Sequence, residues 1–150
     1  MSFPTQILPD HHRHCDDLFV AAEDAVQRAD WAAAARAFEH FHDQMKAHFD
    51  AEEGMLFPAF EAATGMSAGP TQMMRYEHEQ MRTLLARLAA ACEDHDSESY
   101  AGVAETLLML MQQHNMKEEN ILYPMCDQSL GDDAERLGAK IGAMLEKRHA

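Results

Sequence analysis

The chain has 150 residues, of which 47% are hydrophobic, and this length suits a single compact domain. Its 26 acidic residues outnumber its 12 basic ones, and the net charge of −14 argues against nucleic acid and anionic membrane surfaces as partners. No apolar run approaches the roughly 20 residues of a membrane span, and residues 1–10 lack the features of a signal peptide, so we expect a cytoplasmic protein.

Alanine, methionine and leucine are abundant, whereas glycine, proline and β-branched residues are few, which favours helix over strand. We therefore expect an all-α protein. The three cysteines, Cys15, Cys92 and Cys126, lie far apart and form no C-x-x-C motif. Neither a disulfide framework nor a thiolate zinc site is indicated, and we expect these residues to fill the core.

The first helix is expected to begin at Pro9-Asp10, after an irregular arm, with Asp10 as its N-cap. His12 lies near its start and in line with apolar positions spaced by three and four residues. Asp30 is expected to cap the second helix after a short turn.

The second helix carries two polar residues on its apolar stripe. His48 and Glu52 occupy places where an ordinary bundle would have leucine, and burying a carboxylate without a partner is costly, so this stripe indicates a cation. Pro58 is expected to kink the helix just after this point. The full stripe is Phe38, Phe41, Met45, His48, Glu52, Met55 and Ala59.

The second half of the chain begins after a glycine-rich break, with Gly65 as a helix stop and Pro70 in the first turn of the third helix. The third stripe is Met74, His78, Met81, Leu85, Leu88 and Cys92, and the fourth is Leu107, Met111, His114, Glu118, Ile121 and Met125. These elements predict one antiparallel up-down-up-down four-helix bundle over about 10–127, within a single domain of residues 1–150. A short extra C-terminal helix is expected over about 132–147.

One motif occurs twice. Residues 48–58 and 114–124 both read H-x-x-x-E-E-x-x-L-[FY]-P, at an offset of 66 residues. Residues four apart share a helix face, so each histidine and the first glutamate of its motif can converge on one metal or on a metal pair. This repeat predicts two similar helical hairpins, residues 12–58 and 78–124.

The same offset selects one residue from a cluster of three histidines. His11, His12 and His14 match Glu77, His78 and Gln80, so only His12 has a histidine counterpart. Counted along the helices from the two expected turns, His12, His48, His78 and His114 reach about the same depth. We therefore expect all four in one layer of the bundle.

The doubled motif, with the histidines at 12 and 78, resembles the hemerythrin-like (HHE cation-binding) domain. The resemblance extends from about Asp10 to Cys126 and implies a non-haem centre of two iron ions bridged by oxo or hydroxo. It implies six metal ligands: His12, His48, His78 and His114 as terminal ligands, and Glu52 and Glu118 as bridges. Unlike the five-histidine oxygen carriers of that family, this chain has Met74 and Arg82 four residues from His78. A coordination place is therefore either open to small ligands or filled by another side chain.

Other polar residues are weaker candidates for that place. Glu53 and Glu119 are expected to point toward a neighbouring helix or solvent, and Asp16 either binds metal or pairs with Arg82. Tyr76 and Tyr123 either donate to a bound ligand or are ordinary core or interface residues. The remaining histidines are expected mostly at the surface: His11, His14, His40, His42, His95 and His149. A metal-free structural bundle is the alternative to the whole site.

The proposed ligand set indicates a function. Four neutral imidazoles with only two carboxylates are less anionic than glutamate-rich di-iron sites, which favours stable ferrous iron and reversible binding. We therefore expect a cytoplasmic di-iron protein that binds a small diatomic ligand, dioxygen or nitric oxide, for sensing, storage or delivery. Turnover of peroxide or nitric oxide, and the handling of iron itself, stay open as alternatives, because one fold serves all three. No protein partner is indicated.

Overall fold

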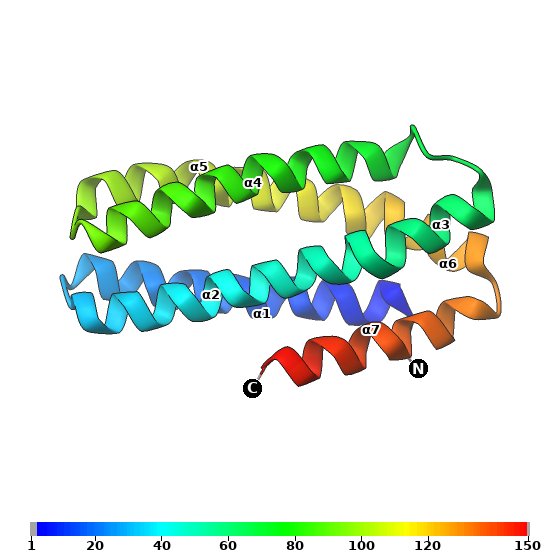
Figure 1. Ribbon diagram of the computed structural model, residues 1–150, viewed down its shortest axis with the longest axis horizontal. Coiled ribbons are helices and arrows are strands. Elements are labelled where there is room, and N and C mark those ends of the chain that lie inside the picture. The colour runs from blue at the N-terminus through cyan, green and yellow to red at the C-terminus, as the bar shows by residue number, and fades with distance from the viewer. Residues whose placement is uncertain (1–2, 150) are drawn as a thin grey trace.

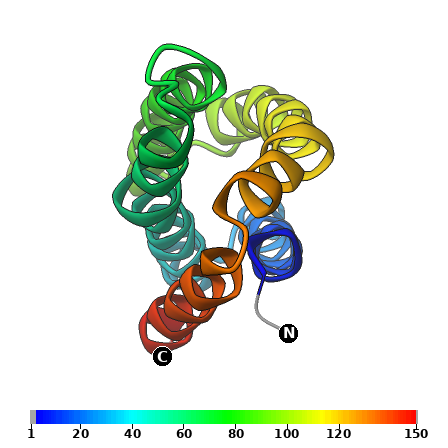
Figure 2. The ribbon, with the colours of Figure 1, turned by 90° about the vertical axis from the view of Figure 1, so that its right-hand side faces the viewer.

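The computed structural model describes residues 3–149, and all regular structure in this range is helical. The helices in chain order are α1 (Pro4–Gln27), α2 (Trp31–Ala51), α3 (Phe57–Thr64), α4 (Pro70–Glu93), α5 (Ser97–Lys117), α6 (Tyr123–Leu130) and α7 (Asp133–His149). Figure 1 shows α1, α2, α4 and α5 as an antiparallel bundle, and Figure 2 shows α7 against its outside, beside α1 and α2. The expected all-α bundle with an extra C-terminal helix is confirmed.

Local signals set several of the helix ends. The Asp30 carboxylate accepts a hydrogen bond from the backbone N–H of Ala33, and so caps α2 as expected. Gly65 ends α3 with a φ of 73°, which glycine adopts without steric cost, and Pro70 is the first residue of α4.

The predicted start of the first helix was wrong. α1 begins at Pro4, so Asp10 is not its N-cap and Pro9 lies inside the helix. Leu8, in this first part of α1, is fully buried in a cluster that includes apolar residues of α7, and Ile7 lies close against Gly142 of α7. This packing against a distant helix offsets the cost of the backbone hydrogen bond that is lost at Pro9.

A π-helical turn precedes each motif proline. These turns, Glu52–Leu56 and Glu118–Leu122, join α2 to α3 and α5 to α6 without a break. In each, the N–H of the next residue, Phe57 or Tyr123, bonds to a carbonyl five residues earlier rather than four. We expected a kink at Pro58; the irregularity that the structure shows is a π-helical turn, and it lies just ahead of the proline ring.

The wider turn changes which residues face the core. Each π-helical turn holds about one residue more than an α-helical turn, which moves the buried positions one residue along the chain, so the stripes predicted with a constant helical period fail after the turn. Ile121 is 56% exposed, and Met55 and Ala59 are only half-buried. The residues that fill the core there are Leu56, Phe57, Phe60, Leu122, Tyr123 and Cys126.

The buried apolar residues form two clusters. The turn-side cluster extends toward the α1–α2 and α4–α5 turns and includes Cys15, Met45, Met81 and Met111. The α7-side cluster joins α3, α6 and α7, and includes Leu8, Tyr123 and Cys126. All three cysteines are buried free thiols, consistent with core packing. No helix within residues 3–149 is long and apolar enough to cross a membrane.

Candidate metal centre

The structure brings the six predicted site residues together between the two apolar clusters. They come from four helices and both π-helical turns: His12 from α1, His48 from α2, Glu52 from the first π-helical turn, His78 from α4, His114 from α5 and Glu118 from the second π-helical turn. All six are buried, and the two glutamates are completely inaccessible to solvent. The layer expected from counting along the helices therefore forms.

Each glutamate contacts histidines from both halves of the repeat. Glu52 lies 2.9 Å from Nε2 of His78 and 3.5 Å from Nε2 of His48. Glu118 Oε1 lies 3.1 Å from Nε2 of His12 and 3.2 Å from Nε2 of His114. Two groups of possible metal ligands result: His12, His48, Glu52 and Glu118, and Glu52, His78, His114 and Glu118. Because both groups contain both carboxylates, the geometry suits two adjacent metals with shared bridges.

The other ring nitrogen of every histidine has an outer partner. The Nδ1 contacts are His12 with Glu119 at 2.7 Å, His78 with Glu53 at 2.6 Å, His114 with Glu77 at 2.7 Å and His48 with His11 at 2.8 Å. A histidine that binds a metal usually donates its second N–H to such a partner, which fixes the tautomer and the ring orientation. All four Nε2 atoms are thereby left to face the middle of the layer.

The outer partner of His48 is neutral: it is His11, which in turn is held by Gln44. Gln44 donates through Nε2 to the carbonyl of Arg148, so its Oε1 accepts from Nε2–H of His11. Nδ1 of His11 then accepts from Nδ1–H of His48, which leaves the Nε2 lone pair of His48 free for a metal. Burial, with a smaller contribution from His48, lowers the pKa of His11 to about 3, so His11 stays neutral.

Two of the outer carboxylates are themselves anchored by cations. Arg82 donates to both oxygens of Glu53, and Lys117 pairs with Glu77. Burial alone would raise the pKa of Glu53, but hydrogen bonds from His78 and Arg82 lower it to about 2. The hydrogen bond from His114 is the main cause that lowers the pKa of Glu77 to about 2. Both groups are therefore anionic acceptors that hold their histidines in place.

The inner layer needs positive charge. Burial lowers the pKa of His114, yet the Glu118 carboxylate and the hydrogen bond to Glu77 raise it to about 10, so protons balance the buried carboxylates when no metal does. Nε2 of His78 lies 2.9 Å from Glu52, but the contact is not aligned as a hydrogen bond. Nε2 of His114 and one oxygen of each glutamate also lack an aligned hydrogen-bond partner within residues 3–149. These donor atoms fit a metal, and imidazole with carboxylate suits iron, zinc or manganese.

Tyr123 adds a seventh polar group to the layer. Its hydroxyl donates to Glu52 at 2.6 Å and lies 2.9 Å from Glu118. The same oxygen is 3.2 Å from Nε2 of His12 and 3.4 Å from Nε2 of His48, so it contacts all four donors of the first group. Its counterpart in the other half, Phe57, has no oxygen. Burial first, and then the charges of Glu118 and Glu52, raise the pKa of Tyr123.

A small cavity borders the layer on the opposite side from Tyr123. Its volume is about 10 Å³, which is near the smallest volume that can hold one water molecule. It touches three of the site histidines and is otherwise mostly apolar: His12, Cys15, Met45, His48, Phe49, Met81, Met111, His114 and Asn115 line it. The apolar lining residues belong to the turn-side cluster, whereas Tyr123 belongs to the α7-side cluster.

Several predictions about neighbouring residues were wrong. His11 was expected at the surface but is buried against His48. Arg82 pairs with Glu53 and Glu79, and no ion pair with Asp16 forms within residues 3–149. Asp16 is exposed, as is Tyr76 at 61%, and neither belongs to the two ligand groups.

The outer partners were missed although the sequence contains a signal for them. His11 and Glu77 are related by the same 66-residue offset as the ligands, and each contacts the histidine 37 residues further on. Glu53 and Glu119 are also equivalent in the repeat, and they hold the equivalent histidines, His78 and His12. The repeat therefore relates the outer partners as well as the inner layer.

Comparison with known proteins agrees with this geometry. The model of the hemerythrin HHE cation-binding domain matches residues 4–126. The chain is also similar to the iron-sulfur cluster repair protein YtfE of Musicola paradisiaca (strain Ech703), with 36% identity over 93 residues. That match covers 55% of this chain and 41% of the relative, so the chain spans less than half the length of the curated protein that it resembles. No solved structure matches the chain.

Proposed function

The chain belongs to the hemerythrin HHE cation-binding family, and from this premise we propose that it is a non-haem di-iron protein that binds dioxygen or nitric oxide beside its metals. Four residues would hold each iron. His12 and His48 bind the first, His78 and His114 bind the second, and Glu52 and Glu118 are shared by both. The support is the pattern of four inward Nε2 atoms, each with its Nδ1 held from outside.

Tyr123 is a further ligand in this proposal. The Tyr123 oxygen lies 2.6, 2.9, 3.2 and 3.4 Å from the four donor atoms of the first group, so it would lie within reach of the same metal. Phe57 has no side-chain oxygen to offer the second group, so fewer residues would hold the second iron and a place would be left for an external molecule.

The size and lining of the apolar cavity would determine which molecule binds. Bound iron supplies the electron-rich centre to which a diatomic molecule binds. The chain's own residues then select by size and polarity. The space of about 10 Å³ beside His12, His48 and His114 is lined by Met45, Phe49, Met81 and Met111. A neutral diatomic molecule suits this lining better than a charged or strongly hydrated one.

The relative in Musicola supports a second candidate function. Because that protein is an iron-sulfur cluster repair protein by name, delivery of iron during repair is consistent with the shared segment. The chain aligns with only 41% of that protein, however, so the activity of the whole relative supports a function for this chain less strongly than the metal site does. Turnover of peroxide or nitric oxide is a third possibility that the same assays separate.

The test uses anaerobic protein loaded with ferrous iron. We expect two irons per chain, together with reversible changes in the absorption spectrum on adding and removing dioxygen or nitric oxide. Steady consumption of nitric oxide or peroxide would instead favour an enzyme, and transfer of iron to an apo-acceptor would favour iron delivery. One iron per chain would overturn the two-metal arrangement.

A cavity variant makes this test specific. Met111→Phe narrows the cavity, so it should weaken binding of the diatomic ligand while the iron content stays unchanged. Met109→Phe is the matched control, because Met109 is on the same helix but is exposed. Equal ligand binding in the two variants, with both folded and loaded with iron, would place the ligand elsewhere.

A further inference from the structure

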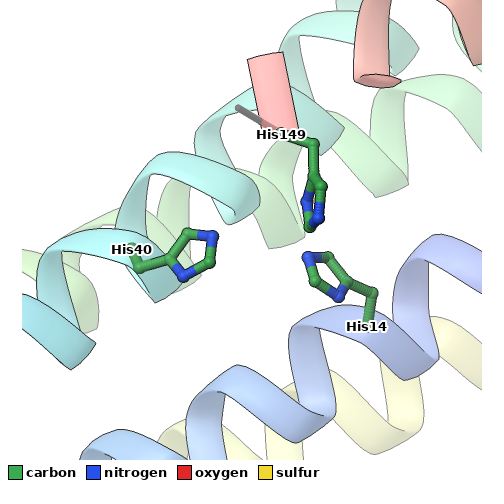
Figure 3. A group of neighbouring side chains, drawn as sticks. All are labelled: His14, His40 and His149. Atoms are coloured by element: carbon green, nitrogen blue, oxygen red, sulfur yellow. The ribbon is translucent and has the colours of Figure 1, made fainter. Parts of the chain in front are cut away.

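Three histidines outside the iron centre point into one space. They come from three helices that pack together: His14 from α1, His40 from α2 and His149 from the last turn of α7. Figure 3 shows the three rings turned toward one another, and one ring nitrogen of each lies within 4.8 Å of the others. The arrangement depends on the docking of α7 on α1 and α2, since His149 and His14 are far apart in the sequence.

Hydrogen bonding within the protein does not account for this grouping. Nε2 of His14 is buried and has no hydrogen-bond partner within residues 3–149. The rings of His14 and His149 meet edge to face, with centroids 4.5 Å apart, and the His40 ring is 6.1 Å from that of His14. In the described part of the chain, none of the three histidines forms an ion pair with a carboxylate. An unpartnered buried nitrogen aimed at two further imidazoles points to a ligand that is not a protein group.

The chemistry of three imidazoles selects the ligand. Neutral imidazole is a strong ligand for zinc, copper and nickel, and three histidines with one place left for water form a common zinc arrangement. With zinc–nitrogen bonds of about 2.0–2.1 Å, the nitrogens of a tetrahedral site lie roughly 3.3 Å apart. His40 and His149 are exposed, so small side-chain rotations can close the remaining gap. The net charge of −14 also draws cations to the molecule.

We propose that His14, His40 and His149 form a second metal site, which takes one divalent transition-metal ion of the zinc type and leaves a coordination place open to water. The site differs from the buried centre because it contains no carboxylate, holds a single ion and is open to solvent. It is independent of the iron that we propose for the buried centre.

Occupation of this site ties the end of α7 to the bundle. The neighbouring residue, Arg148, accepts a hydrogen bond from Gln44 through its carbonyl and pairs with Asp50 through its guanidinium group. An ion bound to His149 therefore secures the same turn of α7 that completes the Gln44–His11 relay to His48. Zinc should consequently raise the melting temperature of the wild-type protein.

The experiment measures zinc uptake by the iron-loaded protein. After equilibration with zinc chloride and removal of loosely bound metal, wild type should retain one zinc per chain with its iron content unchanged. His40→Gln and His149→Gln should each lose this zinc and the accompanying rise in melting temperature. His95→Asn is the control: His95 lies in the turn between α4 and α5 with a φ of 54°, a conformation that asparagine tolerates, and zinc uptake should persist.

The remaining outcomes also decide the proposal. If wild type retains no zinc, or if the His40 and His149 variants retain as much as wild type, the site is refuted. A gain of zinc matched by a loss of iron would show that zinc had entered the buried centre, which also overturns the assignment. In the Glu52→Gln/Glu118→Gln variant the surface zinc should persist, so a failure of the iron centre and a failure of this site give different results.

Discussion

Replacing Glu52 and Glu118 together by glutamine should remove the stabilisation by iron and leave a folded helical bundle. Both carboxylates are completely buried, and without metal they depend on protons held by the neighbouring histidines. Glutamine keeps the size of each side chain but removes its charge. The metal-free double variant should therefore melt at the same temperature as metal-free wild type or above it.

The size of the iron effect follows from binding linkage. A ligand present at 100 times its dissociation constant stabilises the folded state by about 2.7 kcal/mol for one site. For a chain of roughly 150 residues, 1 kcal/mol shifts the melting temperature by about 2–4 °C, so one iron should raise it by about 5–11 °C. Since Glu52 and Glu118 both belong to the two ligand groups, their loss should reduce this shift to near zero.

The assay is helical circular dichroism against temperature, under anaerobic conditions, with and without ferrous iron. Glu39→Gln/Glu105→Gln is the matched control, because it makes the same charge change at exposed positions of the same two long helical segments. It should keep the full shift. A wild type whose melting does not move with iron, or a Glu52/Glu118 variant stabilised as strongly as wild type, would remove these glutamates from the centre.

Three further predictions concern single residues. Tyr123→Phe should remove a visible tyrosine-to-ferric charge-transfer band and keep most of the iron; survival of the band would rule out Tyr123 as its source. His12→Ala should lower iron content, whereas His14→Ala should leave iron nearly unchanged and lose only the surface zinc; equal iron losses would show that the repeat selects the wrong histidine. Glu77→Gln should weaken iron binding by about 10–100-fold, measured by competition with a chelator, and an unchanged affinity would mean that it does not orient His114.

Much of the inner layer could be predicted because it depends on short-range geometry. A spacing of four residues places His48 and Glu52 on one face whatever the rest of the chain does, and the constant helical rise gives their depth. The 66-residue offset then separates His12 from His11 and His14, in agreement with the place of His12 on the apolar stripe of its helix. The structure brings these residues together as that reasoning expects.

The predictions that failed depend on long-range packing or on a change of helical period. Ile121 was expected in the core because a constant period was assumed through Glu118, but the π-helical turn moves the next buried positions to Leu122 and Tyr123. His11 was expected at the surface because the residues that bury it are distant in the sequence. Gln44 bonds to His11, and Gln44 also donates a hydrogen bond to the backbone carbonyl of Arg148 in the last turn of α7. Such contacts leave no periodic trace near His11.

The two halves of the repeat differ in the groups that hold their histidines from outside. His114 is held by the anionic Glu77, whereas the equivalent His48 is held by the neutral His11. An anionic acceptor makes its imidazole a stronger electron donor than a neutral acceptor does. Tyr123 comes from the second half but lies against His12 and His48, so the ligand group that contains the weakly held His48 is also the one that a phenol oxygen contacts. In the proposed centre the protein donors of the two irons would therefore differ: the Tyr123 oxygen would add to the first group, whereas His78 and His114, held by Glu53 and Glu77, would bind the second. An external molecule would then be expected beside His114, the member of the second ligand group that borders the cavity.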